Sequence, residues 1–143
     1  MMDIKEILFS YLYQIAEQHN LTVHIEEESS PIPTCTIPEK KSIFLNYTGI
    51  GERYHAFQFA HELGHYLNGD REHCECDGVI LDIKREYYAN KTGTRLLLTG
   101  LSKNNIYFSS LYDLLEFCGI PFDMVTYVNQ LVKYNYPTLI PSI

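Results

Sequence analysis

Two histidines four residues apart, His61 and His65, constrain this chain more than any other feature of its sequence. They lie in a segment, 52–68, whose apolar positions recur with helical periodicity. In a helix, four residues turn about 400° and rise about 6 Å, so the two imidazole rings can converge on one metal ion. Glu62 lies about 60° around the helix from His65, beside this face rather than on it. The spacing therefore predicts a metal site with an adjacent carboxylate.

Glu86 is the candidate for a third ligand. Catalytic zinc in proteins usually has three protein ligands and one position open to water. Glu86 lies 21 residues after His65, and Asn90 follows it by one helical turn, where its amide can hold a ligand in place. We therefore predict a Zn²⁺ site with the ligands His61, His65 and Glu86. Glu62 would be the general base that takes a proton from the attacking water.

Small residues indicate how the two helices approach each other. Gly64 lies inside the first helix, where glycine costs about 1 kcal/mol relative to alanine, so a close neighbour is the expected reason for it. Ala89 and Gly93 follow Glu86 at i+3 and i+7 in the second predicted helix, residues 82–98. We expect this face to pack tightly at Gly64 and to bring the Glu86 carboxylate to the metal.

A second group of donor side chains follows His65 by eight residues, in His73-Cys74-Glu75-Cys76-Asp77. We expect a solvated loop with free thiols here, because the sequence offers no matching second ligand pair for a structural zinc. The alternative is that one of these cysteines replaces Glu86 as the third ligand. In a cytosolic protein, the four cysteines are expected to be mostly reduced; they are Cys35, Cys74, Cys76 and Cys118.

The other histidines are not expected to bind the metal. His55 lies six residues before His61, about 120° around the helix, so it points away and should be a satisfied, partly buried side chain. His19 and His24, together with the tyrosines, are candidates for stabilising an oxyanion.

Length and charge exclude several classes of protein. The 143 residues suit a single domain, 1–143. A formal charge of −7, with no Lys/Arg cluster longer than two residues, argues against nucleic-acid binding, which needs a basic face. No apolar run approaches the roughly 18 residues of a membrane span. Charged residues from the third position onward argue against a signal peptide, so a cytoplasmic location is expected.

The pattern of the whole chain predicts an α+β fold. Apolar spacing and capping residues predict helices, and alternation with turn residues predicts a small, mainly antiparallel sheet of three strands. We expect strand 42–45 to be the edge to which a peptide adds as a further strand. The predicted helices are 3–19, 52–68, 82–98, about 110–118 and 121–134; the strands are 21–25, 34–37 and 42–45; the tail after residue 136 is expected to be irregular.

Two segments carry a resemblance to a known family. One reads Phe59-Ala60-His61-Glu62-Leu63-Gly64-His65-Tyr66-Leu67, and the later one reads Glu86-Tyr87-Tyr88-Ala89-Asn90, followed by Leu96-Leu97-Leu98. Together they resemble the ImmA/IrrE family of zinc metallopeptidases over about residues 52–98. The resemblance implies a zincin-like domain with zinc ligands at His61, His65 and Glu86 and with Glu62 as general base. Thr92-Gly93 and Leu98-Thr99 depart from the family's usual Phe-Ala and Met-Pro.

Members of this family include prophage and mobile-element proteins that relieve repression by cleaving a helix-turn-helix repressor. The resemblance therefore implies a zinc metalloendopeptidase of the anti-repressor type, with such a repressor as its partner and substrate. Two alternatives are a protein that binds and sequesters a regulator without cutting it, in which zinc is structural, and a general small peptidase.

Overall fold

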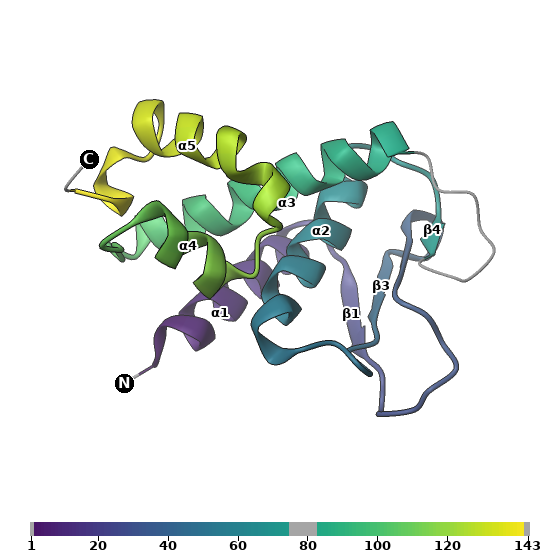
Figure 1. Cartoon of the computed structure of the whole chain (residues 1–143). Coiled ribbons are helices and arrows are strands. Elements are labelled where there is room, and N and C mark those ends of the chain that lie inside the picture. Colours follow the sequence, from purple (N-terminus) through teal and green to yellow (C-terminus); the bar gives the residue numbers. More distant parts are fainter. Residues whose placement is uncertain (1, 75–82, 142–143) are drawn as a thin grey trace.

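The computed structural model describes residues 2–74 and 83–141 and shows a mixed α+β domain in which helices and a small sheet lie on opposite sides of one central helix, α2 (Figure 1). None of the described helices combines the length and the apolar character that a membrane span requires. The helices are α1 (Ile4–Gln18), α2 (His55–Leu67), α3 (Ile83–Lys103), α4 (Leu111–Cys118) and α5 (Val125–Tyr134); the strands are β1 (Thr22–Ile25), β2 (Cys35–Ile37), β3 (Ser42–Leu45) and β4 (His73–Cys74).

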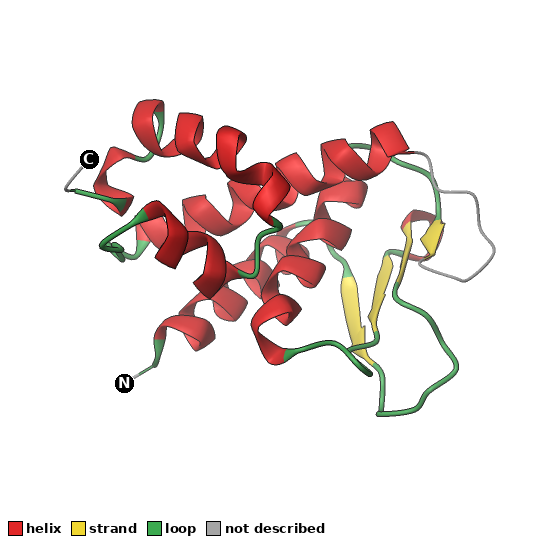
Figure 2. Cartoon of the chain, viewed as in Figure 1, coloured by secondary structure: helices red, strands yellow, loops and turns green. Residues whose placement is uncertain are grey.

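The three predicted strands form one sheet, to which the two-residue strand β4 is added (Figure 2). The strand order is β1-β3-β2-β4, with β1 parallel to β3 and the other two pairings antiparallel. The expectation that 42–45 is an edge strand is therefore wrong. Its Ile43 and Leu45 are fully buried, which suits a central strand covered by α2. β4 lies in a segment expected to be a loop.

The predicted helices all form, with some changed ends. Asp3 caps α1, because its side chain accepts a hydrogen bond from the Glu6 amide at 2.8 Å. α3 continues past Thr99-Gly100, where a stop was expected, to Lys103. Gly100 serves close packing instead, since a Cβ there would lie 2.7 Å from the Tyr11 ring. The first residue of this predicted helix, Asp82, lies outside the described residues.

The C-terminal tail is more ordered than its prolines suggested. A short 3-10 turn spans Pro137–Leu139. Leu139 and Ile140 are buried, and the Phe108 amide donates to the Leu139 carbonyl at 2.7 Å. The tail therefore closes one end of the core, because two apolar side chains outweigh the local preference for irregular structure.

α2 and α3 pack backbone against backbone. A Cβ on Gly64 would lie 2.7 Å from the carbonyl oxygen of Ala89, and one on Gly93 would lie 2.9 Å from the carbonyl carbon of Ala60. Each glycine therefore admits the other helix, as the small residues of the sequence predicted. This double contact fixes the position of α3 along the length of α2.

We predict that Gly93→Ala destabilises the metal-free protein by about 1–2 kcal/mol. Alanine favours a helix by about 1 kcal/mol over glycine. The new Cβ, however, would meet three backbone atoms of Ala60 and His61 at 2.9–3.0 Å, and overpacking against a backbone that cannot yield costs more than this gain. Urea denaturation measures the difference.

Gly51→Ala, at a glycine outside the α-helices, is the control for the added Cβ. Its Cβ would make an ordinary 3.4 Å contact with the Tyr54 ring, so little change is expected. Equal stabilities of Gly93→Ala and the wild type would contradict the close contact between α2 and α3.

Candidate metal centre

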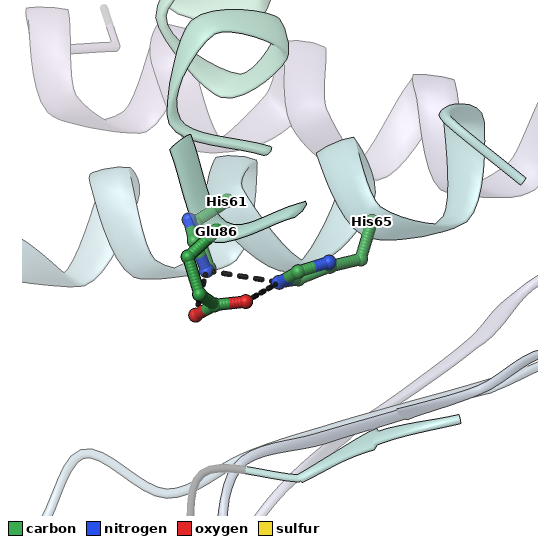
Figure 3. Close-up of side chains that lie close together, drawn as sticks. All are labelled: His61, His65 and Glu86. Carbon is green, nitrogen blue, oxygen red and sulfur yellow. Dashed lines mark hydrogen bonds and ion pairs between the residues drawn. The ribbon is translucent and has the colours of Figure 1, made fainter. Parts of the chain in front are cut away.

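His61, His65 and Glu86 meet at one point (Figure 3). One ligand atom from each lies within 4.8 Å of the others, and the group could hold a metal ion. The Glu86 carboxylate lies 3.3 Å from Nε2 of His61 through Oε1 and 2.7 Å from Nε2 of His65 through Oε2. The two Nε2 atoms are 3.1 Å apart. The arrangement joins the middle of α2 to the first turn of α3, as the sequence predicted.

The other nitrogen of each imidazole is held by an oxygen. Nδ1 of His61 lies 2.7 Å from Oδ1 of Asn90, and Nδ1 of His65 lies 2.8 Å from Oδ2 of Asp70. Both oxygens accept, so both Nδ1 atoms carry the hydrogen in the neutral rings. The predicted role of Asn90 fits this contact. Asp70 was missed, although it follows the predicted helix end by only a few residues.

This tautomer assignment fits a cation between the rings. With both hydrogens on Nδ1, the neutral histidines direct two Nε2 lone pairs and the Glu86 carboxylate at the same point. Two bonds of about 2.1 Å at a tetrahedral angle would separate the nitrogens by roughly 3.4 Å, close to the 3.1 Å between them here. Two imidazoles and one carboxylate are also the donor set of many catalytic zinc sites.

Glu62 lies beside the three ligands and is fully buried. The hydroxyl of Thr36, on β2, donates to its Oε1 at 2.7 Å, and its Oε2 lies 4.0 Å from Nε2 of His61. Thr36 itself is fully buried. Thr36 could not be predicted from the sequence, because its contact with Glu62 depends on how the sheet packs under α2.

Hydrogen bonds within the centre shift two pKa values. Burial lowers the pKa of His65, but its hydrogen bonds to Glu86 and Asp70 outweigh burial and raise that pKa above its usual value. Burial raises the pKa of Glu86, but its hydrogen bonds to His61 and His65 hold that pKa well below its usual range. In the metal-free protein, a proton on His65 thus partly takes the place of a cation.

The remaining histidines lie elsewhere. Nε2 of His55 is 2.8 Å from the carbonyl oxygen of Ile50, and its ring stacks on Tyr47, so the prediction of a satisfied side chain is confirmed. His19 packs edge-on against Tyr66, and His24 stacks on Phe44. Among the described residues, His61, His65 and Glu86 form the one such group of potential ligands.

The cysteines depart from the expectation of free thiols. Cys35 and Cys74 face each other in the β2–β4 pairing and form a disulfide. The sequence could not indicate this pair, because β4 was not predicted. Cys118 is free and buried. Cys74 is thus not the third ligand, while Glu75, Cys76 and Asp77 of the same cluster lie outside the described residues.

The centre draws on three elements, with ligands from α2 and α3 and the Thr36 hydroxyl from β2. Comparisons with protein-family models, curated proteins and solved structures found no match to this chain.

With Zn²⁺ as the probe ion for this site, we predict that Glu86→Ala abolishes tight binding and that Asn90→Ala weakens it about 10- to 100-fold, because the amide orients His61. Competition with a chromogenic chelator measures both affinities. Asn129→Ala, on the exposed side of α5, is the control and should bind zinc like the wild type. Undiminished zinc in Glu86→Ala would place the third ligand elsewhere.

A pH series on the metal-free protein tests the two pKa shifts. The raised pKa of His65 adds to the stability of the folded state. This contribution is fully present below the pKa of His65 in the unfolded chain, about 6.5, and is lost as the pH rises through the pKa in the folded state. The lowered pKa of Glu86 also stabilises the folded state. This contribution is present above about pH 4.3, the pKa of Glu in an unfolded chain, and is lost only as the pH falls through the pKa in the folded state. Between pH 6 and 9, the wild type should therefore lose stability relative to Glu86→Gln, in which His65 lacks its carboxylate partner. Urea denaturation in EDTA measures both, and parallel curves would contradict the shift.

Proposed function

We propose that this protein is a zinc metallopeptidase with a zincin-like catalytic domain. The observation that carries the proposal is the buried carboxylate of Glu62, which Thr36 holds beside His61 and the other two ligands. A purely structural metal site needs no such group, since a buried carboxylate is costly unless it is paired. Zinc suits the donor set of two imidazoles and one carboxylate.

A bound zinc ion would polarise the carbonyl of a peptide and lower the pKa of the attacking water. Glu62 then accepts a proton from this water as its oxygen bonds to the carbonyl carbon. The hydroxyl of Thr36 keeps Oε1 in place, so the acceptor needs no reorientation. Glu62 returns the proton to the leaving amine as the C–N bond breaks. Asn90 and Asp70 keep the two imidazole rings oriented throughout.

The substrate we propose is a regulatory protein, namely a helix-turn-helix repressor cut at one site in the cytoplasm. The support is the resemblance of residues 52–98 to the ImmA/IrrE family, together with the ligands and base that this segment contributes. The net charge of −7 favours a protein substrate over direct contact with DNA.

Glu62→Gln separates cleavage from binding. The variant should retain zinc, because Glu62 is not one of the three ligands, and should lose at least about 10³-fold of its peptidase activity, the upper part of the usual range for a general base. Glu17→Gln, an exposed substitution on α1, is the control. The assay incubates each zinc-loaded protein with helix-turn-helix repressors from the same genome as candidate substrates and follows the fragments by mass spectrometry.

Each possible result supports a different one of the three candidate functions. Fragments from the wild type alone support the peptidase. Equal relief of repression by the wild type and Glu62→Gln, without fragments, would instead show a protein that sequesters its regulator. Cleavage of unfolded casein at comparable rates would show a general peptidase.

A further inference from the structure

A cavity of about 340 Å³ opens beside the metal centre. His61 and Glu86 form one side of it. The rest of its lining comes from Ile50, Tyr54, Phe57 and Gln58, in the turn before α2 and its first residues, and from Asn90 of α3. A group that enters the cavity therefore lies next to two of the three ligands.

The walls of the cavity are mainly apolar. Among its described lining residues, Glu86 is the one carboxylate, and no Lys or Arg lines it. A charged side chain in this cavity would thus lose water without gaining a counter-charge of its own, since Glu86 is already engaged by the two histidines. Tyr54, Phe57 and His61 follow one another at helical spacing, so the apolar wall leads directly to the metal ligand.

One polar group at the wall is unusual. Gln58 is 9% exposed, and its Nε2 donates to Oγ1 of Thr34 at 2.9 Å. That hydroxyl in turn donates to the carbonyl of Asn46, which fixes the orientation of the amide. Oε1 of Gln58 is buried without a hydrogen-bond partner among the described residues. Binding cavities are often of this kind, apolar with a few polar groups that orient the ligand.

We propose that this cavity is the subsite for a large apolar side chain, such as Phe or Leu, of the residue next to the scissile bond. The inference rests on the proposed peptidase function and deepens it by naming the substrate class. The volume is at the lower end of that of ligand pockets, about 300–1,000 Å³, and so suits one bulky side chain. Apolar burial in it should give at least about a tenfold gain in affinity over alanine.

Amino-acid hydroxamates test the subsite without a known substrate. The probes are the N-acetyl hydroxamates of Phe, Leu, Ala and Asp, titrated calorimetrically into the zinc-loaded protein. The hydroxamate group binds the metal in every case, so differences among the four report the side chain. We expect Phe and Leu to bind at least tenfold tighter than Ala, and Asp to bind no tighter than Ala.

Variants assign this preference to the cavity. Phe57→Ala should reduce the ratio of Phe to Ala affinities at least threefold, and Phe57→Leu should restore most of it. Phe122→Ala removes a phenylalanine that is 67% exposed and lies outside this cavity, so it should leave the ratio unchanged.

The outcomes separate the two proposals. Equal binding of all four probes, or a ratio that Phe57→Ala does not alter, would overturn the subsite while leaving the metal centre in place. Failure of all four probes to bind the zinc-loaded protein would overturn the subsite together with the open metal position on which the proposed function depends.

Discussion

The backbone contact between α2 and α3 is the constraint on which the metal centre depends. Gly64 and Gly93 each accept the other helix at a distance that leaves no room for a Cβ. Because Glu86 lies seven residues, about two turns, before Gly93, the contact that fixes Gly93 also fixes the height of the carboxylate along α2. The close packing of the two backbones, rather than long and adaptable side chains, thus positions Glu86 beside His61.

The charges around the ligands explain why this rigid arrangement suits a cation. Glu62, Asp70 and Glu86 surround two histidines, and their side chains are exposed by only 0%, 14% and 21%. Among these five side chains, three carboxylates carry more negative charge than two imidazoles would carry positive charge even if both were protonated. Nε of Arg85 lies 3.5 Å from the outer oxygen of Asp70. Buried charge of one sign is costly, so a divalent cation would balance the excess negative charge of these three carboxylates.

The sequence predicted the parts of this structure that are local to a helix. The spacing of His61, Glu62 and His65 follows from helical geometry, and small residues predicted the contact that brings Glu86 to them. What it missed depends on pairing between distant segments. Thr36 reaches Glu62 only because β2 packs under α2, and the central position of Ser42–Leu45 depends on which strands become neighbours. The Cys35–Cys74 disulfide likewise follows from the register of β2 and β4.

Helical geometry also explains how one short helix can carry a base, two ligands and a cavity wall. At about 100° per residue, Gln58, His61, Glu62 and His65 fall within an arc of roughly 100°, whereas Phe59 and Leu63 point away from it into the core. Within that arc the base faces β2 and its Thr36, while Gln58 and His61 border the cavity. A peptide bond held at the ligands would therefore have the proton acceptor on one side and a place for its side chain on the other. This division of one helix face makes the proposed hydrolysis and the proposed subsite parts of a single arrangement.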